Sequence, residues 1–372
     1  MYDSIHGASP SQSAPLCTEA TGTGEEVKVG LGGIDRLVDL LLRERNVKSS
    51  DAMQRLRNSK FLLITLLFCL ACSSYGVKKT DHKASASSRP VKGLRLISII
   101  AAGRLGSSPL YRPTGIAIDF QGNIFIADTG NDRVVKCDSE GRFLTEAGGF
   151  GSGAGEFNRP TYVATDNGLN VYLVDAQNKR IQRLDRNLNF ISTIQIKEDG
   201  DLAGLGLPEG IALTPSGEIV VSDTEGDLLI EVSSFSEHKT TYGGFGEIEG
   251  GLRDPLGVFV NRNGDVYVAD SRNDRVAVFD QFGNFLKSLG EKVLSNPGGV
   301  TVGQDQSVYV ANTGGSSLVV LGPEGNLIAE YGKLEQGIMS LSRPTDLEFG
   351  EGGKLFLVDS GNNRVVVFEV VR

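Results

Sequence analysis

Short apolar runs alternate with glycine- and asparagine-containing turns along most of the chain, from about residue 93 onward. The runs are rich in Val, Ile, Tyr and Phe, a composition typical of β-strands bounded by turns. They recur in six units, each of which is predicted to contain four strands joined by two glycine turns and one Asp-x-x-Asn turn. A proline opens each unit, at spacings of 47, 48, 47, 42 and 47 residues: Pro113, Pro160, Pro208, Pro255, Pro297 and Pro344.

This repetition predicts the fold. A four-stranded unit cannot bury both of its faces alone, whereas six such sheets stacked radially around a channel can. The sixth unit contains only three strands before Arg372, and the apolar stretch 93–100 is predicted to supply the fourth, which would remove exposed edges. We therefore expect an all-β fold, a six-bladed β-propeller closed by addition of an N-terminal strand to the last blade.

The repeated positions carry a recognisable pattern. After the opening proline come a glycine and alternating aliphatic residues, then an aromatic residue, and then an Asp-x-x-Asn-x-Arg sequence. In this register, residues 93–372 resemble the NHL-repeat family of six-bladed β-propellers. The departures are local: Tyr162 and Asp346 stand where glycine is usual, unit three lacks the arginine, and unit five lacks both the acid and the arginine.

An acid or its amide follows each proline by fifteen residues, and in four units an arginine follows five residues later. A half-buried carboxylate without a partner is costly, so we expect structural ion pairs and not catalytic carboxylates. Unit five supports this pairing, because Asn312 and Ser317 remove both charges together. The expected pairs are Asp128 with Arg133, Asp175 with Arg180, Asp270 with Arg275, and Asp359 with Arg364.

Two further repeated positions have alternative interpretations. In unit three, Asp223 keeps its charge while Leu228 replaces the arginine, so this acidic turn is either solvated or a contact for a cation or partner. The residue three positions before each acid or amide is aromatic except in unit three, where it is Val220. It is expected to pack between blades, because it lies mid-strand in every unit; a stacking platform is the alternative. These aromatics are Phe125, Tyr172, Tyr267, Tyr309 and Phe356.

Charge differs between the two parts of the chain. Residues 1–92 contain 13 basic and 9 acidic residues, a net charge of +4, whereas residues 93–372 contain 24 basic and 37 acidic residues, a net charge of −13. The acidic field of the repeats disfavours nucleic acid as a partner. With 40% apolar residues, the composition argues against a disordered chain and a polytopic membrane protein.

The N-terminal part has a pattern that is typical of an export signal. The apolar run 61–71 is too short to cross a bilayer but has the length of a signal-peptide core, and three basic residues precede it. Leu70, Ala71 and Cys72 resemble the lipobox of bacterial lipoproteins, which implies lipidation of Cys72; an ordinary secretory signal cut near Ala71 is the alternative. We expect residues 1–52 to be an uncertain leader or a mis-called start, 53–72 the signal, 73–92 a flexible tether, and 93–372 the propeller.

This interpretation predicts a location in the bacterial cell envelope. Cysteine use agrees with it, because Cys137 is the single cysteine left in the propeller and no disulfide framework is expected. The resemblance to lipoproteins implies a lipid anchor in the outer membrane, with the propeller facing the periplasm or the exterior. A single anchor of this kind holds a protein on a membrane without spanning it.

The face formed by the Asp-x-x-Asn turns is the expected binding surface. Antiparallel strands bring these turns and the segments before each proline to the same side of the ring. We expect this face to carry arginines and to expose three side chains near the channel mouth: Arg112, Arg159, Arg253 and Arg343, with Tyr162, Glu209 and Asp346. Such a patch would bind a carboxylate, a phosphate or an anionic glycan. Alternatively, the arginines brace neighbouring blades.

The expected function is a membrane-anchored, non-enzymatic scaffold for a protein, peptide or glycan, without cofactor, metal or nucleic acid. The alternative is a metal-dependent hydrolase or lyase at the channel mouth, similar to lactonase or amidating-lyase propellers. The propeller contains one histidine, His238, too few for a histidine-rich zinc centre. Glu209 and Asp346 belong to opposite blades and are not expected to share one ion. A purely structural role in an envelope assembly is a third possibility.

Overall fold

A computed structural model describes residues 93–100, 103–166, 169–194, 206–232, 239–244, 249–332 and 340–371. The signal segment, Cys72, the tether and His238 lie outside the described residues, so the expectations for them stay predictions. No helix in the described ranges is long and apolar enough to cross a membrane.

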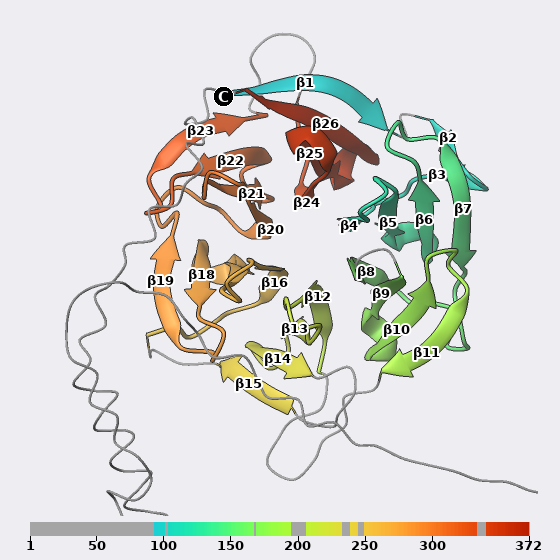
Figure 1. The fold of residues 1–372 in the computed structure, drawn as a ribbon, viewed down its shortest axis with the longest axis horizontal. Coiled ribbons are helices and arrows are strands. Elements are labelled where there is room, and N and C mark those ends of the chain that lie inside the picture. Colours follow the sequence, from blue (N-terminus) through green and yellow to red (C-terminus); the bar gives the residue numbers. More distant parts are fainter. Residues whose placement is uncertain are drawn as a thin grey trace, which may run out of the picture. The chain divides into compact units, whose positions relative to one another are not determined.

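Six four-stranded antiparallel sheets are arranged radially around a central channel (Figure 1). In each blade the first strand lies innermost and the fourth lies outermost. Blade one comprises β4 (Gly115–Ile118), β5 (Ile124–Asp128), β6 (Arg133–Cys137) and β7 (Phe143–Gly148). Blade two comprises β8 (Pro160–Asp166), β9 (Asn170–Asp175), β10 (Arg180–Asp185) and β11 (Phe190–Ile194). Blade three comprises β12 (Pro208–Leu213), β13 (Ile219–Asp223), β14 (Leu228–Val232) and β15 (Lys239–Gly243).

The remaining blades follow the same order. Blade four comprises β16 (Pro255–Val260), β17 (Val266–Asp270), β18 (Arg275–Phe279) and β19 (Phe285–Leu289). Blade five comprises β20 (Pro297–Val302), β21 (Val308–Asn312), β22 (Ser317–Leu321) and β23 (Leu327–Tyr331). A short hairpin of β2 (Arg104–Leu105) and β3 (Ser108–Pro109) precedes blade one. The predicted six-bladed fold is therefore the fold of the described chain.

Blade six combines the two ends of the repeat region. It contains β24 (Pro344–Phe349), β25 (Lys354–Asp359) and β26 (Arg364–Val371), and β1 (Gly93–Ile100) forms its fourth strand. β1 pairs antiparallel with β26 from Gly93 opposite Val371 to Ile100 opposite Val365, with one register shift between Leu96 and Ser98. The pairing joins residues more than 260 positions apart and gives β26 a partner on its outer edge.

The core lies between adjacent blades. The repeated aromatic residues are buried there, with exposed fractions from 0% for Phe125 and Tyr309 to 8% for Tyr267. One cluster joins Phe356 of blade six to Ile124 and Cys137 of blade one, so the free thiol is a packed side chain. Burial of such side chains contributes about 1.5–3 kcal/mol each, which ties every blade to its neighbours.

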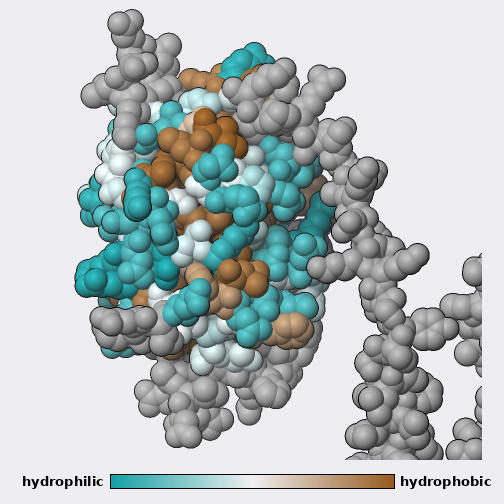
Figure 2. Space-filling view, turned by 90° about the vertical axis from the view of Figure 1, so that its left-hand side faces the viewer, coloured by the Kyte–Doolittle hydropathy of each residue, from teal (hydrophilic) through white to brown (hydrophobic). Residues whose placement is uncertain are grey.

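The outer wall is a mixed surface. The outermost strands of blades four and five expose apolar side chains, with Leu286 51%, Leu327 49% and Ile328 40% exposed. Figure 2 views the side of the molecule that carries β19 and β23 and shows apolar patches separated by hydrophilic residues. Apolar residues scattered in this way are normal for a soluble surface.

Candidate functional site

An inter-blade hydrogen bond positions the residue that precedes the opening proline in five of the six blades. Arg112, Arg159 and Arg343 adopt positive φ angles of 49°, 58° and 48° at this position. The N–H of Arg112 donates to Asn363 Oδ1 at 2.7 Å, and that of Arg159 donates to Asp132 Oδ1 at 2.8 Å. The acceptor lies in each case in the turn of the preceding blade, four residues after the acid that ends the second strand. This contact, which the sequence reasoning missed, fixes where the arginine side chains emerge.

Three of the four predicted arginines line one pocket. Arg112, Arg159 and Arg343 surround a cavity of about 390 Å³ on the face of the Asp-x-x-Asn turns. The other lining residues contribute hydroxyl groups and one tyrosine: Tyr111, Thr114, Thr129, Thr345 and Ser360. Arg112 and Arg343 are exposed, and no acidic side chain in the described ranges pairs with either of them. We name this cavity the arginine pocket.

The fourth arginine lies elsewhere. Arg253 precedes its proline by two residues, and Asp254 occupies the position with positive φ. The N–H of Arg253 donates to Asp270 Oδ1 at 2.7 Å, whereas Asp254 pairs with Arg272. Arg253 does not line the arginine pocket, because the residues of that pocket come from blades six, one and two, whereas Arg253 belongs to blade four.

The expectation that Tyr162, Glu209 and Asp346 are exposed is wrong. Their exposed fractions are 6%, 6% and 8%. The Tyr162 hydroxyl donates to the carbonyl oxygens of Gly298 at 2.7 Å and Thr345 at 3.1 Å, so the side chain reaches from blade two to blades five and six. The tyrosine that replaces the glycine found at this position of the repeat thus extends across the channel and does not project from its mouth.

Glu209 is the ion-pair partner of Arg159. Glu209 is buried, while the Arg159 side chain is 38% exposed and lines the arginine pocket. Burial raises the pKa of Glu209 to about 7, against the opposing effect of the Arg159 charge. Arg159 therefore braces blades two and three while it also faces the pocket, which combines the two interpretations considered for the arginines.

Asp346 lies inside the channel. Its carboxylate accepts the N–H groups of Ile116 and Leu347, both at 2.9 Å, and burial raises its pKa well above the usual value. Glu348, two residues further along β24, lines the same cavity, and burial raises its pKa to about 7. Sequence reasoning missed Glu348, although an acid two residues after Asp346 on one strand was the available signal.

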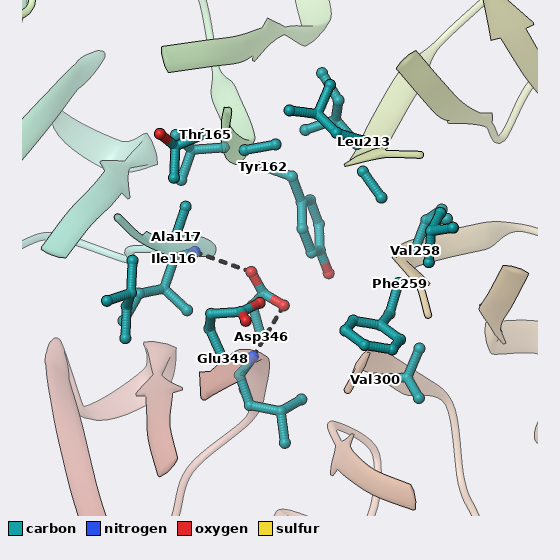
Figure 3. Close-up of a pocket in the computed structure, with 17 residues that line it drawn as sticks. Ile116, Ala117, Tyr162, Thr165, Leu213, Val258, Phe259, Val300, Asp346 and Glu348 are labelled. Atoms are coloured by element: carbon teal, nitrogen blue, oxygen red, sulfur yellow. Dashed lines mark hydrogen bonds between the residues drawn. The ribbon is translucent and has the colours of Figure 1, made fainter. Parts of the chain in front are cut away.

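These residues bound a cavity of about 180 Å³ (Figure 3). We name it the channel cavity; it is lined by the innermost strands, mainly by Ile, Val, Ala and Leu, with the rings of Tyr162 and Phe259. Glu209 does not line it, so the structure separates Glu209 from Asp346. No three His, Cys, Asp or Glu side chains in the described ranges are grouped so that they could hold a metal ion.

The four expected Asp/Arg partners lie together. In each of these blades, Nε of the arginine donates to Oδ2 of the acid at 2.7 Å, and the acid is 0% exposed. In blade three, backbone N–H groups take the place of the arginine: Asp223 accepts from Gly206, Leu207, Glu225 and Gly226 at 2.5–3.1 Å. Asp223 is buried at 2% exposure and is therefore neither solvated nor open to a cation.

Two segments match the NHL repeat family model, residues 110–137 and 252–279. They cover the first three strands of blades one and four. Among curated proteins, the B-box type zinc finger protein ncl-1 of Caenorhabditis elegans is 50% identical over 44 residues, and Protein brain tumor of Drosophila melanogaster is 44% identical over 50 residues. These matches span 12% and 13% of this chain and only 5% of either relative's length.

Solved structures match the fold over a longer range. A streptogramin B lyase matches with a TM-score of 0.52 at 12% identity, over 75% of this chain and 98% of the lyase. A catalytically inactive virginiamycin B lyase from Staphylococcus aureus with quinupristin has the same TM-score at 13% identity, over 75% of this chain and 99% of the lyase. A Bacteroides thetaiotaomicron protein of unknown function reaches 0.58 at 15% identity, over 75% and 76%. At these identities the likeness extends to the fold alone.

Proposed function

We propose that this six-bladed, NHL-repeat-bearing β-propeller is a non-enzymatic binding module that captures an anionic group of a protein, peptide or glycan in the arginine pocket. One observation carries the proposal: Arg112, Arg159 and Arg343 converge on one cavity, although up to 231 residues separate them. Guanidinium groups recognise carboxylates and phosphates through paired hydrogen bonds. Since Arg112 and Arg343 have no acidic partner among the described residues, their donors are available to a ligand.

The pocket walls support recognition beyond charge alone. Ser360 supplies a hydroxyl group that can donate to a ligand, whereas Thr114, Thr129 and Thr345 already donate to backbone carbonyl oxygens. The ring of Tyr111 is 52% exposed and offers an apolar surface with defined geometry. The body around this pocket is acidic, with a net charge of −13 over residues 93–372. An anionic ligand would therefore be drawn to this local basic site and repelled elsewhere.

We further propose that the propeller works at a membrane surface, held by a lipid on Cys72 in the bacterial cell envelope. The lipobox-like sequence and the basic, apolar segment before it support this proposal. A tether of about twenty residues would let the ring reach partners near the membrane.

The binding proposal is tested by replacing Arg112 and Arg343 with asparagine. Blade five already carries Asn296 at the equivalent position, with a φ of 42°, so the substitution suits the local backbone. We expect Arg112→Asn/Arg343→Asn to weaken binding of sulfate and of acidic oligosaccharides on an array by about tenfold or more, equivalent to ~1.4 kcal/mol or more. Isothermal titration calorimetry at low salt measures the change.

Arg262→Asn is the matched control, because Arg262 is an arginine on the opposite side of the ring, between the first two strands of blade four. Binding should be unchanged in this variant. Equal affinity of the double variant and the wild-type protein would contradict the proposal. A double variant that is less stable but, where folded, binds with the wild-type affinity would contradict it too. A stoichiometric divalent ion in the purified protein, lost on Glu209→Ala, would instead favour the metal-dependent hydrolase or lyase.

A further inference from the structure

The channel cavity is separate from the arginine pocket. Tyr162 lines the channel cavity and Thr345 lines the arginine pocket, and the Tyr162 hydroxyl donates to the Thr345 carbonyl oxygen. The second bond, to the Gly298 carbonyl oxygen, holds the ring across the channel. The tyrosine therefore separates the two cavities, and a ligand of the channel cavity enters from the opposite mouth of the ring.

The charges in this cavity have one sign. Asp346 and Glu348 are the only ionisable side chains besides Tyr162 among the residues that line it, and no lysine, arginine or histidine is among them. Two backbone N–H groups hold Asp346, but neither carboxyl has a cationic partner in the part of the chain that the structure describes. A buried carboxylate without compensating charge takes up a proton, in line with the raised pKa of both carboxyls. A cation in the cavity would replace that proton and supply the compensating charge.

The walls favour an organic cation over a metal ion. Figure 3 shows the rings of Tyr162 and Phe259 directed into the same space as the carboxyl groups of Asp346 and Glu348. Aromatic rings attract alkylated ammonium groups through their negative faces, while the aliphatic walls fit methyl and methylene groups. A metal ion needs several oxygen, nitrogen or sulfur ligands, and the described residues offer no group of three suitable side chains.

One hydroxyl group at the cavity has no hydrogen-bond partner in the described ranges. The Oγ1 of Thr165, which lines the cavity, is buried without a partner among the described residues. The Oγ1 of Thr301 in blade five is also buried without a partner in this part of the chain, but Thr301 does not line the cavity. Leaving such groups unpaired is costly.

We infer that the channel cavity binds a small organic ammonium ion, with its charge against Asp346 and Glu348 and its alkyl groups against Tyr162, Phe259 and the aliphatic walls. The cavity volume of about 180 Å³ limits the ligand to a few carbon atoms beyond the ammonium group. This site is independent of the arginine pocket, so either can exist without the other.

Choline is the probe for this site, and dimethylbutanol is its uncharged isostere. In calorimetric titrations of the purified full chain at about pH 8, where the Glu348 carboxyl is largely ionised, choline should bind saturably at one site. Glu348→Gln keeps the side-chain shape but removes the charge, and should weaken binding by about tenfold or more. Dimethylbutanol should bind the wild-type protein no more tightly than choline binds the Glu348→Gln variant.

Two variants protect the conclusion from a folding artefact. Glu231→Gln, on β14 and outside the channel cavity, is the matched control and should bind choline like the wild-type protein. Phe259→Leu keeps both carboxyls and should weaken choline binding severalfold, more than it weakens dimethylbutanol binding. Near-ultraviolet circular dichroism reports whether each variant is folded.

Three results would overturn the inference. These are the absence of saturable choline binding, equal affinity for choline and dimethylbutanol, and unchanged affinity in a folded Glu348→Gln variant. Tight binding of Ca²⁺ that the same variant abolishes would assign the cavity to a metal ion and would also overturn it. None of these results depends on the affinity of the arginine pocket for sulfate.

Discussion

At the scale of single residues, one buried carboxylate organises each blade turn. Oδ1 of Asp359 accepts the N–H of Ser342 at 2.7 Å, and Oδ2 accepts Nε of Arg364 at 2.7 Å and Nδ2 of Asn362 at 2.8 Å. The acid thus fixes both the connection into the blade and the turn between its second and third strands. All of its strong acceptor positions are engaged, which explains why a 0% exposed carboxylate is tolerated.

Blade five provides a neutral version of this arrangement, which allows a matched test. Arg364→Ser leaves the buried Asp359 carboxylate without its cation, and we expect a loss of about 3 kcal/mol in the free energy of unfolding. Asp359→Asn/Arg364→Ser copies the Asn312 and Ser317 pair, whose Nδ2 and Oγ lie 3.1 Å apart, and should recover part of that loss. Urea denaturation measures both. A double variant less stable than the single variant would contradict this account.

At the scale of elements, turns of neighbouring blades are linked in a ring. In five blades the residue before the proline has a positive φ, and its N–H donates to a side chain of the preceding turn. The acceptors are Asn363, Asp132, Asp227, Asp274 and Ser316. The bond from Arg112 to Asn363 joins blades one and six, so it acts where the ring closes. Blade two carries Lys179 at the acceptor position, and this side chain cannot accept a bond.

Lys179 in blade two supplies the control for the hydrogen bond from Arg112 to Asn363. Asn363→Gly removes the acceptor for Arg112 while glycine keeps the positive φ of 54°. Lys179→Gly changes the equivalent residue, with φ of 51°, where no acceptor is lost. We expect Asn363→Gly to be about 1 kcal/mol less stable than Lys179→Gly relative to the wild-type protein. Equal thermal midpoints of the two variants would show that the hydrogen bond does not stabilise ring closure.

At the scale of the whole molecule, the ring separates two polar sites of opposite sign. The arginine pocket carries three cationic side chains on one face, and the channel cavity carries two carboxyls behind Tyr162. Closure through β1 and β26 holds blades one and six together, and these blades supply most of the arginine pocket. Because β1 is the first described element, a tether attached to it would enter the ring at blade six.

The proposed anchor is tested on the full chain in a bacterial host. Cys72→Ala removes the thiol that would carry the lipid, so we expect the protein to leave the membrane fraction and to lose labelling by radioactive palmitate. Cys137→Ala is the matched control, because this thiol is buried between blades and should not be modified. Labelling that persists in Cys72→Ala would rule out lipidation at this cysteine.

The sequence alone determined the number of blades, the strand order and the Asp/Arg partners, because these depend on local spacing. Asp359 and Arg364, for example, end up opposite each other as soon as their two strands form a hairpin. Tyr162 and Asp346 could be recognised as departures from the repeat for the same reason. The environment of these two side chains could not be predicted from the sequence, because it depends on distances across the channel between blades that are far apart in the sequence.

Only the tertiary structure decided which side chains meet. It grouped Arg112, Arg159 and Arg343 in one pocket and left Arg253 out, since the pocket lies over blades six, one and two and Arg253 belongs to blade four. It also directed Tyr162 across the channel and enclosed Glu348 beside Asp346. The physical reason is that burial and charge pairing are properties of the closed ring, in which the inner strands of all six blades meet around one channel.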